Sequence, residues 1–161
     1  MIDVGGGDSR LVDCLLQRQV TCISVLDISG AALARAQRRV GPAGTCVKWI
    51  EADITGEWAI PVVDMWHDRA VFHFLTNAHD RDRYRARIRE AVRPGGSVIM
   101  ATFGPGAPEL CSGLPVVRYS PQALAAELGA PFRLEESVRE MHTTPFGTTQ
   151  EFWYSRLTRE D

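Results

Sequence analysis

The chain has 161 residues and a formal net charge of −2, with 18 Lys and Arg against 20 Asp and Glu. This length suits one domain with a full hydrophobic core, so we expect residues 1–161 to form a single domain. The near-neutral charge gives no electrostatic reason to expect a nucleic-acid partner. Without a signal-like start or a run of roughly 18 apolar residues, we expect neither secretion nor membrane spanning.

The four cysteines lie at wide, irregular spacings, at positions 14, 22, 46 and 111. They form no Cys-x-x-Cys pair and have no histidine at the spacing of a zinc finger. This pattern favours reduced thiols, a cytoplasmic location and no metal site.

The first half of the chain alternates between strand-like and helix-like patterns. We expect strands over 1–4 and 20–26, each followed by an amphipathic helix, with Ser29 as the cap of the second helix. Further strands are expected over 46–50 and 62–66. A short apolar helix should follow the second of these and end at Leu75.

The second half begins with a helix expected over 79–92, whose alternate arginines we interpret as a solvated face. A Pro-Gly-Gly turn and a strand over 97–103 should follow. The last two β-like runs, 132–141 and 150–158, flank a turn-rich segment and predict an antiparallel hairpin. The fold class is therefore α/β: a doubly wound, mostly parallel seven-stranded sheet with an antiparallel C-terminal hairpin.

A glycine-rich turn joins the first strand to the first helix. Glycines there allow a ligand to approach the backbone, and the helix N-terminus favours negative groups. The dinucleotide fingerprint requires Gly or Ala three residues after its second glycine, but Arg10 stands in that place after Gly7. This departure counts against NAD and FAD.

Acidic residues at three strand ends complete the pattern: Asp3 begins Asp-x-Gly-x-Gly-x-Ser, Asp27 ends the second strand and Asp53 follows the third. Together with the turn Arg93-Pro94-Gly95-Gly96, this series resembles the class I S-adenosylmethionine-dependent methyltransferase superfamily. The resemblance implies S-adenosyl-L-methionine as cofactor. It places the methionine part at Asp3 and the glycines, the ribose at Asp27 and the adenine at Asp53. The cofactor-binding residues that it implies are Asp3, Gly5, Gly6, Gly7, Asp27, Ile28, Ala52, Asp53, Ile54 and His67.

The chain departs from the superfamily in two places. Ser9 stands where a glycine is common, and Met1 already belongs to the first strand, which we interpret as truncated at its N-terminus. Members of the superfamily usually carry a helical segment before that strand, folded over the cofactor. We therefore expect a pocket that is open on one side, and we favour a start codon further upstream over cover supplied by a homodimer.

The stretch that begins at His67 and Asp68 lies where the superfamily places the residues that flank the transferable methyl group. It is similar to a segment of thiopurine methyltransferases and of some protein-lysine methyltransferases, so we take both residues as candidate catalytic groups. His142 is a third candidate, because ligands bind beyond the carboxyl ends of strands and histidine is the commonest general base. A turn histidine that only caps Thr143 remains the alternative. His73, between two phenylalanines, is interpreted as a packed side chain.

The expected reaction is methyl transfer to an O, N or S nucleophile, and we favour a small molecule as the acceptor. The long connection over 104–119 is expected to form a lid or wall of the substrate site, with Cys111, Leu114 and Arg118 in it. Two alternatives stay open: a protein-lysine methyltransferase, and a cofactor-binding module without activity.

Overall fold

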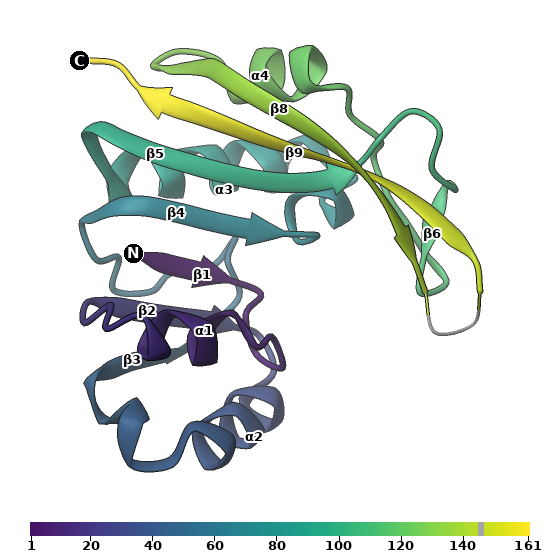
Figure 1. Cartoon of the computed structure of the whole chain (residues 1–161). Helices are drawn as coiled ribbons and strands as arrows, with labels where there is room; N and C mark the ends of the chain where they lie inside the picture. The colour runs from purple at the N-terminus through teal and green to yellow at the C-terminus, as the bar shows by residue number, and fades with distance from the viewer. Residues whose placement is uncertain (145–146) are drawn as a thin grey trace.

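The structure is a computed structural model that describes residues 1–144 and 147–161 (Figure 1). Its main feature is a seven-stranded sheet with the strand order β3-β2-β1-β4-β5-β9-β8. The first five strands of this sheet are parallel, whereas β9 runs antiparallel to both β5 and β8. The predicted doubly wound sheet with a C-terminal hairpin is therefore confirmed.

The strands of the large sheet are β1 Ile2–Val4, β2 Ile23–Asp27, β3 Val47–Glu51, β4 Val63–Arg69, β5 Val92–Phe103, β8 Phe132–Thr143 and β9 Thr149–Arg159. The helices are α1 Leu11–Gln17, α2 Gly30–Val40, α3 Ala78–Ala91 and α4 Pro121–Leu128, with short 3-10 turns η1 Gly41–Cys46 and η2 Phe72–Phe74. Within the described residues, no helix is long and apolar enough to cross a membrane.

Three predicted boundaries are wrong, and strand pairing explains each of them. The strand β4 continues to Arg69, because its last residues pair with β1 on one side and β5 on the other. Consequently His67 and Asp68 lie within a strand and not after it. The strand β5 begins at Val92, and the predicted turn 93–96 is a bulge in its pairing with β4. His142 pairs with β9 inside β8, and residues 145–146 of the predicted turn lie outside the described residues.

The long connection over 104–119 contains a second, two-stranded sheet, formed by β6 Leu110–Cys111 and β7 Leu114–Pro115. This small sheet lies beside the far end of the β8–β9 hairpin (Figure 1). Both Leu110 and Leu114 are more than half exposed. The segment is therefore an ordered surface element near the end of the hairpin.

Helices cover both faces of the large sheet, with α3 and α4 on one face and α1 on the other (Figure 1). The main hydrophobic core lies under α3 and α4, where Trp66, Phe72 and Tyr84 are among the largest fully buried side chains. A smaller core under α1 and α2 includes Val12 and Leu33. Burial of apolar surface on both faces is the main force that holds the helices against the sheet.

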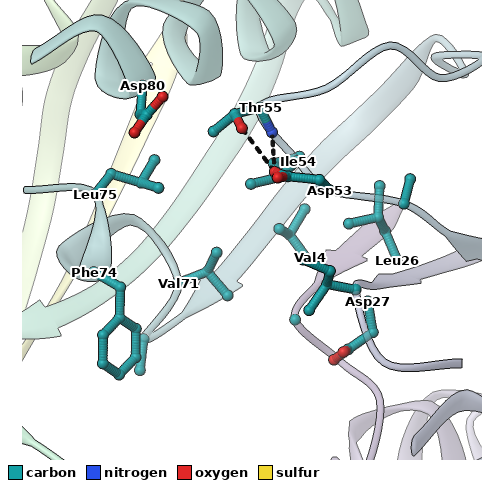
Figure 2. Close-up of a pocket in the computed structure, with 14 residues that line it drawn as sticks. Val4, Leu26, Asp27, Asp53, Ile54, Thr55, Val71, Phe74, Leu75 and Asp80 are labelled. Atoms are coloured by element: carbon teal, nitrogen blue, oxygen red, sulfur yellow. Dashed lines mark hydrogen bonds between the residues drawn. The ribbon is translucent and has the colours of Figure 1, made fainter. Parts of the chain in front are cut away.

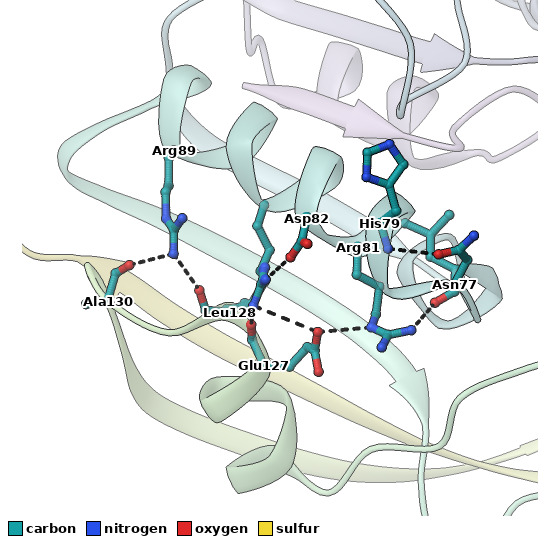
Figure 3. Close-up of polar contacts among 10 residues, drawn as sticks. Asn77, His79, Arg81, Asp82, Arg89, Glu127, Leu128 and Ala130 are labelled. Atoms are coloured by element: carbon teal, nitrogen blue, oxygen red, sulfur yellow. Dashed lines mark hydrogen bonds and ion pairs between the residues drawn. The ribbon is translucent and has the colours of Figure 1, made fainter.

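The arginines of α3 do not form a purely solvated face, so that interpretation is wrong. Arg81 donates to Glu127 and to two backbone carbonyls, and Arg85 and Arg89 donate to carbonyls at the end of α4 (Figure 3). Residues four apart share one side of a helix, so these three guanidinium groups point the same way. They join α3 to α4, whereas Arg83 is exposed.

Candidate functional site

A cavity of about 450 Å³ opens at the carboxyl ends of β1 and β2. Figure 2 shows Asp27 on one side of it and Phe74, Leu75 and Asp80 on the other. Six of the residues predicted to bind the cofactor line this cavity, namely Gly5, Asp27, Ile28, Ala52, Asp53 and Ile54. Ala70, Val71, Phe74 and Leu75, from the stretch that begins at His67, also line it. Thr55 and Asp80, which no sequence pattern indicated, complete its wall.

Backbone N–H groups and one hydroxyl hold the two acidic side chains of the cavity in position. The Asp27 carboxylate accepts hydrogen bonds from the Gly7 N–H at 2.9 Å and the Ser29 N–H at 2.8 Å. The Asp53 carboxylate accepts from the backbone N–H of Thr55 at 2.8 Å and from its hydroxyl at 2.7 Å. Ionised carboxylates accept hydrogen bonds at more than two sites, so both groups keep capacity for hydroxyl or amino donors of a ligand.

The turn after β1 requires glycine at two successive positions. Gly5 has φ +71°, a conformation that glycine adopts without strain, and a Cβ there would lie 2.2 Å from a Val71 methyl. A Cβ on Gly6 would lie 2.3 Å from Oδ2 of Asp3. Close approach of this turn to both β1 and the segment after β4 therefore excludes any larger side chain.

A second hollow, of about 390 Å³, adjoins the cavity, and Val4 and Gly5 line both. The predicted residues Asp3, Gly6 and His67 line this hollow, and Nδ1 of His67 lies 2.7 Å from Oδ1 of Asp3. The other oxygen of Asp3 is buried and has no hydrogen-bond partner among the described residues. A buried acceptor without a partner is costly, so it marks a place where a ligand donor would be stabilised.

Asp68 is fully buried and therefore does not line either space. Its carboxylate accepts from the backbone N–H of Val71 at 2.8 Å, from that of Phe72 at 3.0 Å and from the Tyr84 hydroxyl. The Tyr84 hydroxyl also accepts from the indole N–H of Trp66 at 3.0 Å. The carboxylate thus holds the turn that presents Val71 to the cavity, which is a positioning function.

Two other histidines, His73 and His142, differ in their surroundings. His73 is buried, its Nδ1 accepts from the Phe103 N–H at 3.2 Å, and burial lowers its pKa to about 4. It is the packed side chain that the sequence indicated. His142 is half-buried on β8, with its ring 6.2 Å from that of Phe152, and it lines neither space. Its catalytic role therefore stays a prediction.

A comparison with known families matches residues 1–96 to the family described as "Methyltransferase domain". The match covers more than half of the chain, so the chain belongs to this family. No curated protein sequence matches it.

Several solved methyltransferases share the fold. One is an N-methyltransferase from Bradyrhizobium japonicum, with a TM-score of 0.78 and 15% identity over 99% of this chain and 85% of that one. Another is the 1,6-didemethyltoxoflavin-N1-methyltransferase of Burkholderia thailandensis, with a TM-score of 0.79 and 19% identity over 99% of this chain and 70% of that one. A glycopeptide N-methyltransferase has a TM-score of 0.71 and 15% identity over 98% of this chain and 81% of that one.

Fold, site and family together define a class I S-adenosylmethionine-dependent methyltransferase. The residues present fit its cofactor. Oδ2 of Asp3 is an unpartnered acceptor suited to an ammonium group. The carboxylates of Asp27 and Asp53 are suited to hydroxyl and amino donors, and between them the cavity wall is mostly apolar.

Asp68→Asn should abolish one pH-dependent part of the stability. Burial raises the pKa of the Asp68 carboxyl from 3.8 to about 6. The folded state then binds this proton more tightly than the unfolded chain, so the carboxyl's contribution to the free energy of unfolding falls as the pH rises between these values. We expect the wild-type free energy of unfolding, relative to the variant, to fall by about 2 to 3 kcal/mol between about pH 4 and about pH 7.

Urea denaturation at a series of pH values measures this difference. Asp64→Asn is the matched control, because Asp64 lies on the same strand with its side chain 73% exposed. A pH-independent difference between wild type and Asp68→Asn would show that the buried carboxyl does not titrate in this range.

Proposed function

We propose that this methyltransferase acts on an O, N or S nucleophile of a small molecule. The observation that carries the proposal is the cavity lined by Gly5, Asp27 and Asp53 with a second hollow beside it. The cavity suits the adenosine part of the cofactor, and the adjoining hollow suits its methionine part, with a small acceptor at the rim of the hollow. We further propose that residues 1–161 act as one methyltransferase domain, since strands from both ends of the chain share one sheet.

The roles that we propose for the cofactor-binding residues follow from their hydrogen-bonding capacity. Asp27 would accept from the ribose hydroxyls and Asp53 from the adenine amino group. Asp3 would use its unpartnered oxygen for the methionine ammonium group, with His67 holding the other oxygen. The glycine turn, with Ile28, Ala52 and Ile54, would supply backbone and apolar contacts.

The bound cofactor supplies an electrophilic methyl group on a sulfonium sulfur. The protein's own task is then to orient the acceptor, to exclude water and, where the nucleophile is protonated, to accept its proton. Val71, Phe74 and Leu75 provide apolar surface that keeps water from the cavity wall. Asp68 contributes by holding the turn that positions this surface.

Charge favours a small acceptor over a lysine side chain. A lysine acceptor would need an accessible acid for its cationic group, but Asp68 is fully buried and hydrogen-bonded to Tyr84. The exposed residue at the end of β4 is instead Arg69, which would repel an ammonium group. Among the structures with the same fold, the Burkholderia enzyme was solved with bound 1,6-didemethyltoxoflavin and S-adenosylhomocysteine.

Asp27→Asn should weaken binding of S-adenosylhomocysteine roughly ten- to a hundredfold, about 1.5 to 3 kcal/mol, because it removes a charged hydrogen-bond acceptor. Asp13→Asn is the matched control, since Asp13 lies on α1, away from both spaces, and its carboxylate bonds to Arg39. Isothermal titration calorimetry measures both variants. Equal losses in the two would leave Asp27 with a structural role only.

His142 is proposed as the general base on the strength of its position against Phe152, a ring that Arg69 also contacts. His142→Ala should reduce turnover by roughly a hundredfold or more, as expected for loss of general base catalysis, and keep the melting temperature. A screen of acceptors with labelled cofactor, followed by thermal denaturation, tests both parts. Unchanged turnover would assign this histidine to packing alone.

A further inference from the structure

Arg69 has an unusual environment for an exposed arginine. It is the last residue of β4 and lines the second hollow together with His67 and Arg10. Its Nε donates to the Tyr154 hydroxyl at 2.9 Å, and its Cζ lies 5.2 Å from the centre of the Phe152 ring. Two contacts from β9 therefore hold the guanidinium plane in one orientation at the rim of the hollow.

The terminal nitrogens of Arg69 have no hydrogen-bond or ion-pair partner in the described part of the chain. Neither acid that lines the hollow is paired with Arg69, because Oδ1 of Asp3 lies against His67 and Asp8 is paired with Arg35. A guanidinium group keeps its charge at all ordinary pH values and offers paired N–H groups that match a carboxylate. The rim of the hollow thus carries the positively charged guanidinium group of Arg69, which is held in place and whose terminal N–H groups can donate to a ligand.

The position of Arg69 connects this group to the methyl-transfer site. The next two residues, Ala70 and Val71, line the cofactor cavity, and Val4 and Gly5 line both spaces. His142 and Tyr154 approach from the C-terminal hairpin, around the Phe152 ring. With the methionine part of the cofactor at Asp3 inside the hollow, an acceptor at the rim would meet Arg69 beside the cofactor.

We infer that Arg69 binds an anionic group, with carboxylate as the best match, on the small-molecule methyl acceptor. The inference rests on the proposed function and adds the substrate class to it. Tyr154 is a positioning residue in this account, because its hydroxyl acts on the acceptor only through the orientation of Arg69.

Binding of matched carboxylates and amides to the protein saturated with S-adenosylhomocysteine tests this inference. The probes are salicylate, anthranilate and thiosalicylate with their carboxamides, so that O, N and S nucleophiles are all represented. Titration followed by ligand-observed NMR gives the dissociation constants. We expect the carboxylates to bind about tenfold more tightly than the amides, as for a charge-assisted hydrogen bond.

In Arg69→Gln this preference should disappear, and in Tyr154→Phe it should decrease, while both variants bind S-adenosylhomocysteine as the wild type does. Arg38→Gln is the control for the loss of one charge, because Arg38 is exposed on α2 and lines neither space. It should retain the full preference. Three results overturn the inference: no preference for carboxylates in the wild type, a preference that survives Arg69→Gln, or a tenfold loss of S-adenosylhomocysteine binding in that variant. Failure of the wild type to bind S-adenosylhomocysteine would instead refute the proposed function.

Discussion

The pairing of β1 between β2 and β4 is the constraint on which the rest of the site depends. This strand has three residues, and each of them pairs in parallel on both sides, with Val4 opposite Leu26 and Asp68. Parallel strands end at the same edge of the sheet, so the glycine turn, Asp27 and the end of β4 meet there. Because both neighbours are parallel, the acidic groups at or after the carboxyl ends of β1, β2 and β3 all lie at this one edge of the sheet.

The buried Asp68 carboxylate extends this arrangement to the far wall. It receives hydrogen bonds from two backbone groups of the turn after β4 and from Tyr84 on α3. Loss of one of these partners would leave a buried polar group unsatisfied, at a cost of about 1 to 3 kcal/mol. The wall of the cavity is therefore connected to the core under α3. Asp68, which the sequence indicated as a candidate catalytic group, has a positioning function in this structure.

Much of this architecture could be predicted from the sequence, because its signals are local. Strand and helix periods, the glycine turn and the acids Asp27 and Asp53 all lie within a few residues of the structure they specify. The end of β4 could not be predicted, because the polar residues at 67–69 have the local pattern of a loop. They are in a strand because their backbone groups pair with the neighbouring strands β1 and β5. The arginines of α3 were misinterpreted for the same reason, because their partner Glu127 lies on another helix.

The missed cavity residue Asp80 carries no motif, and only the packing of α3 against the sheet brings it to the ligand space. Arg69 follows His67 and Asp68 in the stretch that the sequence indicated, but its orientation depends on Tyr154, which is 85 residues away along the chain. Contacts of this range follow from topology and not from local pattern. The predicted general base, His142, belongs to the same group, since its surroundings depend on the register of β8 against β9.

Calorimetric titration of the purified protein with S-adenosylhomocysteine and, separately, with NAD tests the central claim most directly. The two ligands share adenosine, but only the first carries an amino acid group for Asp3, and Arg10 interrupts the dinucleotide fingerprint. The account predicts saturable binding of S-adenosylhomocysteine at one site per chain and no measurable binding of NAD. Tight NAD binding with no response to S-adenosylhomocysteine would contradict it.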